Sequence, residues 1–103
     1  MRAEVLEQVF VKRAAGAYEL LLVLESAAGS RERVNLTAPG QDEGAAMRFL
    51  AAYLRQEGLG ISRRARVRRH RGQGLEEAPD LLERLRSISG TGSQPEGGSG
   101  RWD

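Results

Sequence analysis

The chain has 103 residues, a formal net charge of +2 and no cysteine, and 40% of its residues are hydrophobic. This composition is typical of one small globular domain, and it excludes disulfide bonds, thiolate metal sites and cysteine nucleophiles. No apolar run approaches the roughly 20 residues that a membrane-spanning helix needs, and Glu4 and Glu7 interrupt the apolar stretch of a secretion signal, so we expect a cytoplasmic protein without membrane contact.

The first third of the chain predicts three strands. Residues 4–13 mix β-branched and aromatic side chains with charges, which favours a strand. Tyr18–Glu25 alternates with a period of two, as a half-buried strand requires, and Arg33–Thr37 predicts a short third strand. The connections are short and contain glycine, so we expect an antiparallel meander.

The hydrophobic period then changes to that of a helix over residues 42–57. Pro39 and Gly40 precede this segment and Gly58 follows it, as helix boundaries often do. The apolar stripe has helical spacing and consists of Ala46, Phe49, Leu50, Tyr53 and Leu54. We expect this amphipathic helix to pack on the strands.

The second half of the chain is less regular. Apolar residues alternate weakly with arginines over 61–71, and this segment is either a fourth strand or an extended arm. A short helix over 79–88 has one apolar side, and at this length it must dock on the core, on a second copy of the chain or on a partner. Residues 90–103 are rich in glycine and serine, which predicts a disordered tail that includes Trp102.

These elements predict an α+β fold with a small antiparallel sheet of three to four strands packed by one amphipathic helix. We divide the chain into a domain over 1–74, a short docking helix over 75–89 and the tail over 90–103. One sheet face is expected to need a second cover, because Leu21 and Val23 lie opposite the main apolar stripe of their strand. The helix 79–88 or a second subunit is expected to provide it.

Six arginines fall within nine residues that contain no acidic residue, while the rest of the chain holds ten basic and fourteen acidic residues. Guanidinium groups stay charged and are costly to bury without partners. In an extended strand, Arg64, Arg66 and Arg68 would form a row on one face about 6.6 Å apart, close to the phosphate spacing of a single strand. The sequence therefore predicts a nucleic-acid-binding segment made of Arg63, Arg64, Arg66, Arg68, Arg69 and Arg71.

An alternative interpretation stays open for the same arginines. They are expected to meet an acidic protein partner, a second subunit, or the acidic residues Glu76, Glu77 and Glu83 of the same chain. In this case the protein is an interaction or assembly subunit, a homodimer or part of a larger complex. Its interface would combine the second sheet face with the C-terminal helix, through Leu21, Val23, Leu81, Leu82, Leu85 and Ile88.

The residues that carry catalysis are scarce. His70 is the only histidine and lies among arginines, and no nucleophile motif or phosphate-binding loop surrounds it. The adjacent carboxylate pairs Asp42–Glu43 and Glu76–Glu77 are typical of a helix start or a solvated surface. We expect no catalytic residue, no metal and no cofactor, and hence an accessory binding protein.

Two families resemble parts of the chain. The order of elements over residues 9–57 resembles the arm-binding domains of tyrosine recombinases. Three stretches, Val34–Leu54, Arg63–Gly74 and Pro79–Ile88, are similar in order to the small β–helix region, the arginine-glycine linker and the helical part of actinobacterial nucleoid-associated bridging proteins. Gln73 stands where that linker has its second arginine, and no functional residue is taken over from either family.

Overall fold

The computed structural model describes residues 4–89, and within them it contains five strands and two helices. The elements follow in the order β1 (Val5–Ala14), β2 (Ala17–Glu25), β3 (Arg31–Pro39), α1 (Glu43–Glu57), β4 (Gly60–Arg71), β5 (Gly74–Glu77) and α2 (Pro79–Ser89). The predicted α+β class is confirmed. The three predicted strands of the first third and both predicted helices are present, with boundaries that differ by one or two residues.

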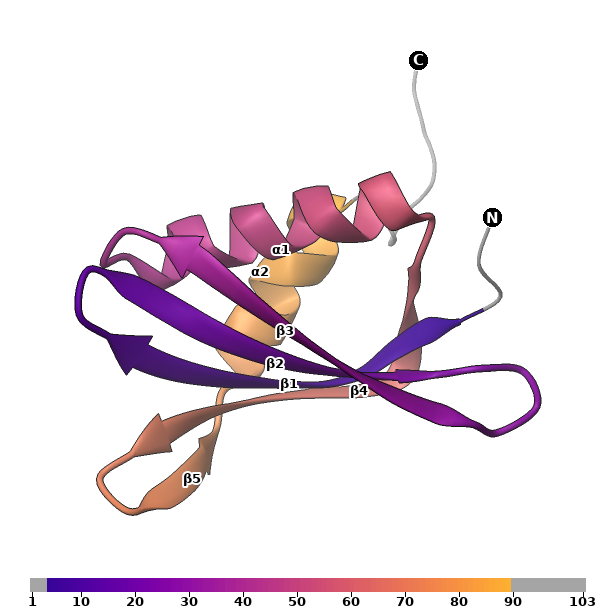
Figure 1. The fold of residues 1–103 in the computed structure, drawn as a ribbon, viewed down its shortest axis with the longest axis horizontal. Coiled ribbons are helices and arrows are strands. Elements are labelled where there is room, and N and C mark those ends of the chain that lie inside the picture. The colour runs from indigo at the N-terminus through magenta and orange to yellow at the C-terminus, as the bar shows by residue number, and fades with distance from the viewer. Residues whose placement is uncertain (1–3, 90–103) are drawn as a thin grey trace.

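All five strands form one sheet in the order β3-β2-β1-β4-β5 (Figure 1). The meander β1-β2-β3 is antiparallel as expected, but β4 pairs with β1 in parallel and β5 pairs with β4 in antiparallel fashion. The prediction of a purely antiparallel sheet of three to four strands was therefore wrong in this detail. A parallel pair needs a long crossover, and α1 provides it between β3 and β4.

The basic segment is a strand and not a free arm. Ala65 and Val67 of β4 are buried, while the neighbouring Arg66 is exposed, so the weak alternation of the sequence does reflect a half-buried strand. Its register against β1 is irregular, because Leu6 pairs with Ile61 and Gln8 with Arg66. The same position of β1 carries a bulge against β2, so Leu6 and Val9 both point into the core.

Local sequence signals fix the two ends of α1. The carboxylate of Asp42 caps the first turn by accepting hydrogen bonds from the main-chain N–H groups of Gly44 and Ala45, at 3.3 and 3.1 Å. Gly58 ends the helix in the left-handed conformation, with φ of 69°, which glycine adopts without the steric cost that other residues incur.

Both helices pack on the same face of the sheet, and α2 lies against α1 and β4 (Figure 1). Their apolar sides join the strands in one core, to which α1 contributes Met47, Leu50 and Leu54, and α2 contributes Leu81 and Leu85. The expectation of a single packing helix was therefore incomplete. The helix 79–88 does not cover the second sheet face, which carries neither helix; we call this side the open face.

The structure also bears on the predicted division of the chain. β5 crosses the predicted boundary between residues 74 and 75, and α2 shares the core of the strands. The predicted tail over 90–103, with Trp102, lies outside the described residues. Within residues 4–89, neither helix combines the length and the apolar character that crossing a membrane would require.

Candidate functional site

The six arginines of the basic segment do not share one surface. Because successive residues of a strand point to opposite faces, Arg66 and Arg68 lie on the open face and Arg69 lies on the helix side. The predicted row of Arg64, Arg66 and Arg68 is interrupted, since Arg64 falls within the register shift between β1 and β4.

Arg69 is the centre of an ion-pair cluster on the helix side. Its guanidinium donates to both carboxylate oxygens of Glu43, at 2.9 and 3.0 Å, and to Glu76 at 2.8 Å, and it lies 3.8 Å from Asp80. The hydrogen bonds to Glu43 and Glu76 raise the pKa of Arg69 further above its usual value. The cluster therefore ties β4 to the start of α1, to β5 and to the start of α2.

Two arginines on the open face are also engaged within the chain. Arg66 donates a hydrogen bond to Glu77, and this bond lowers the pKa of the Glu77 carboxyl below its usual value. Arg68 donates to the side-chain oxygen of Gln8, and its guanidinium carbon lies 4.7 Å from the centre of the Phe10 ring, which is a cation–π contact.

The other three arginines are more accessible. Arg71 contacts Glu76 at 3.4 Å, but 72% of its side chain is exposed. Arg63 and Arg64 are exposed, and neither side chain forms an ion pair within residues 4–89. The prediction that Glu76 and Glu77 take up part of the arginine charge is confirmed, whereas Glu83 forms no ion pair with them in this part of the chain.

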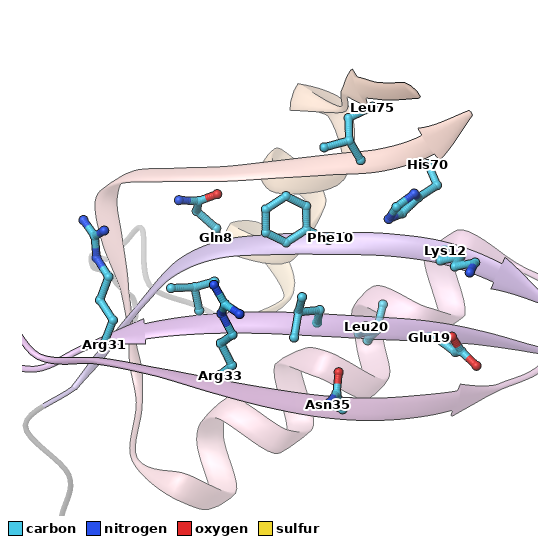
Figure 2. Close-up of a pocket in the computed structure, with 12 residues that line it drawn as sticks. Gln8, Phe10, Lys12, Glu19, Leu20, Arg31, Arg33, Asn35, His70 and Leu75 are labelled. Atoms are coloured by element: carbon cyan, nitrogen blue, oxygen red, sulfur yellow. The ribbon is translucent and has the colours of Figure 1, made fainter. Parts of the chain in front are cut away.

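The open face carries a groove of about 1010 Å³, which we call the central groove (Figure 2). β1 supplies Phe10 in the middle of it, and most side chains in Figure 2 lie on the side of the sheet away from the helices, whereas Leu20 belongs to the core on the helix side. The lining residues come from β1, β2, β3, β4 and β5 and are Gln8, Phe10, Lys12, Glu19, Leu20, Leu21, Val23, Arg31, Arg33, Asn35, His70 and Leu75.

The charge of the central groove is positive. Lys12, Arg31 and Arg33 line it, whereas Glu19 is the only carboxylate among its lining residues in the described part of the chain. Lys12 and Arg33 are exposed and have no ion pair within residues 4–89. Arg31, whose side chain is 61% exposed, contacts the mostly buried Glu7 at 3.2 Å, so part of its charge is met within the chain.

The six interface residues predicted from the sequence lie on two different sides of the sheet. Leu21 and Val23 line the central groove on the open face. Leu81 and Leu85 are buried inside this chain, and Leu82 and Ile88 are partly buried against the same core. The predicted set therefore does not form one surface, because α2 lies on the opposite side of the sheet from Leu21 and Val23.

Sequence reasoning missed the residues that surround Phe10 in the groove. Gln8, Phe10 and Lys12 alternate with the buried Val9 and Val11 on β1. The same alternation on β3 sends Arg31, Arg33 and Asn35 to the open face, while Val34 and Leu36 pack on the core. This period of two is visible in the sequence of both strands, and it is the signal that identifies these residues as neighbours on one face.

His70 is exposed and lines the central groove. Among residues 4–89, no three histidine or acidic side chains gather as metal ligands would. Comparison of the chain with protein families, with curated proteins and with solved structures finds no match.

Proposed function

We propose that this protein is a non-catalytic module that binds single-stranded nucleic acid on the open face of its sheet. One observation carries the proposal: the central groove places Lys12, Arg31 and Arg33 around an aromatic ring, with Glu19 as the opposing carboxylate. Cations that neutralise phosphates release counterions, and this release drives the binding of nucleic acids.

The arginines of the basic segment that already form ion pairs within the chain make the central groove a better binding site for nucleic acid than the basic segment as a whole. Arg66, Arg68 and Arg69 already face carboxylates of the same chain, so a polyanion would have to compete with Glu43, Glu76 and Glu77 for them. Lys12 and Arg33 form no ion pair within residues 4–89, although Glu19 lies directly across from Lys12 on β2. The predicted nucleic-acid contact thus moves from the β4 segment to cations on β1 and β3.

The other side chains of the groove suit exposed bases. Phe10 offers the part of its aromatic ring that the Arg68 guanidinium, 4.7 Å from the ring centre, leaves uncovered. Asn35 and Gln8 carry amides that donate and accept hydrogen bonds at base edges. Such contacts reach bases that are splayed out of a single strand, whereas a duplex keeps its bases stacked.

Two double variants with the same change in net charge test the proposal. Lys12→Glu with Arg33→Glu reverses two cations of the groove, and Arg63→Glu with Arg64→Glu reverses two exposed arginines outside the groove lining. Affinity for labelled single-stranded DNA and RNA is measured across a salt series. We expect the first variant to lower affinity and to reduce the slope of log affinity against log salt by about 1.4, since each single-strand phosphate contact contributes about 0.7.

The matched control should keep most of the affinity and the salt slope. Equal losses in both variants would assign binding to the overall charge and not to the groove. An absence of binding by the unmodified protein at low salt would overturn the proposal. If light scattering then showed that the groove variant alone changes the mass of the particle, the open face would be an interface between copies of the chain.

A further inference from the structure

A second hollow lies where two hairpins of the sheet separate. β1 and β4 pair only as far as Val11 and Arg69; beyond these residues β1 turns into β2, and β4 turns into β5. The two hairpins diverge at this end of the sheet (Figure 1). The hollow between them has a volume of about 580 Å³, which is within the usual range of small-molecule sites. We call it the hairpin pocket.

The accessible charge of the hairpin pocket is positive. Arg13 from β1 and Arg71 from β4 line it, together with His70 and Gly72. Arg13 is exposed and has no ion pair within residues 4–89, and Arg71 is largely exposed beside Glu76. The pocket also contains Glu43, but both oxygens of this carboxylate accept hydrogen bonds from Arg69, so its charge is compensated.

We propose that the hairpin pocket binds a phosphate monoester. A monoester carries about two negative charges at neutral pH and three acceptor oxygens. Two guanidinium groups match this group better than ammonium groups do, because each presents a planar fork of donors. Gly72 has a positive φ of 62° at the hairpin turn, and without a Cβ it leaves the main chain open to close approach by the ligand.

The position of the pocket relates it to the proposed function. His70 is common to the linings of the hairpin pocket and the central groove, but the pocket also contains Arg69 and Glu43, which lie on the helix side of the sheet. The two hollows therefore lie on opposite faces of the sheet, next to the gap where the hairpins diverge. A strand whose bases lie in the groove would have to pass through the gap between the two hairpins for its end to reach Arg13 and Arg71. The inference rests on the proposed function in this one respect: the monoester is the terminal phosphate of the bound strand. Free phosphate shares the same chemistry.

The first test uses inorganic phosphate, which needs no nucleic acid. The full chain is titrated with phosphate, and with chloride at equal ionic strength, while NMR follows the main-chain signals of Arg13, His70 and Gly72. We expect a saturable shift with phosphate alone, and its loss in Arg13→Gln with Arg71→Gln. The variant Arg63→Gln with Arg64→Gln removes the same charge elsewhere and should respond like the unmodified protein. Equal responses to phosphate and chloride would overturn the proposal.

The second test compares oligonucleotides of one sequence with a 5′-phosphate, a 3′-phosphate or neither. We expect one terminal phosphate to raise affinity about ten-fold, as charge-assisted hydrogen bonds would, and Arg13→Gln with Arg71→Gln to remove this gain. If every oligonucleotide bound equally, the hairpin pocket would not be a site for a terminal phosphate, and the proposal that the central groove binds nucleic acid would still hold. If phosphate bound and no oligonucleotide did, the proposed function would fail and the pocket would remain as a site for small phosphate monoesters.

Discussion

At the scale of single residues, β4 shows how a strand tolerates six arginines. The charge of Arg66, Arg68, Arg69 and Arg71 is divided between the two faces and met by carboxylates of neighbouring elements, with Glu77 on the open face and Glu43 and Glu76 on the helix side. Arg63 and Arg64 remain exposed. Opposite charges on paired strands stabilise a sheet, and like charges opposed to one another destabilise it. A dense arginine segment in a sequence is therefore compatible with an internal ion-pair network as well as with a polyanion site.

The pair of Arg66 and Glu77 gives a prediction for pH. The hydrogen bond from Arg66 lowers the pKa of Glu77 from its usual 4.5, so its contribution to stability is present above that value and is lost as pH falls through the lowered pKa. Arg66→Gln should move the pKa of Glu77 back toward 4.5, as measured by carboxyl NMR titration. Arg63→Gln should leave it unchanged, and an unchanged titration in both variants would show that the pair does not form in solution.

At the scale of elements, α2 belongs to the core of its own chain. Leu85 has 0% exposure and Leu81 has 4%, and they pack with α1 and the strands. The sequence predicted that this short helix docks on the core, on a second copy of the chain or on a partner. The structure shows that its apolar side packs on the core of the same chain. The Arg69 cluster adds polar contacts at the start of α2 through Asp80.

The burial of Leu85 predicts the effect of its truncation. Leu85→Ala should destabilise the folded chain by about 3 kcal/mol, because it leaves a cavity between α2 and the core. Urea unfolding followed by circular dichroism measures this loss. The loss caused by Leu85→Ala should be the same at low and at high protein concentration, and a loss that grew with concentration would place Leu85 at an interface between chains.

At the scale of the whole molecule, the sheet has one covered face and one open face. Both helices lie on the side of Leu20, Leu22 and Leu24, while Leu21 and Val23 point the other way. Sheets made mainly of antiparallel pairs commonly keep one face in solvent, and in this sheet that face carries the central groove. The open face is therefore the surface on which we expect the binding function of this protein.

Neighbouring leucines of β2 test this asymmetry. Leu22→Ala should cost about 3 kcal/mol, since Leu22 is fully buried under the helices. Leu21→Ala should cost about 1 kcal/mol, because that side chain is only partly buried on the open face. The two free energies of unfolding are compared by urea denaturation. Equal losses would mean that the open face is covered in solution, which light scattering would then trace to self-association.

The sequence by itself determined the elements whose signals are local. The period of two predicted β2, the stripe of period 3.6 predicted α1, and Gly58 predicted where that helix ends. These signals depend on which side of a single element meets the core, so they can be identified without knowing what covers it. The α+β class follows from them.

The tertiary structure alone decided which elements meet. The parallel pairing of β1 with β4 brings Arg68 to Gln8, which lies 60 residues earlier, and it builds both the central groove and the hairpin pocket. Local periodicity carries no information about strand order. A strand with alternating apolar residues can bury its apolar side next to any other strand whose apolar side faces the same core. The partners of the arginines, the side on which α2 docks and the composition of the groove therefore depend on long-range pairing.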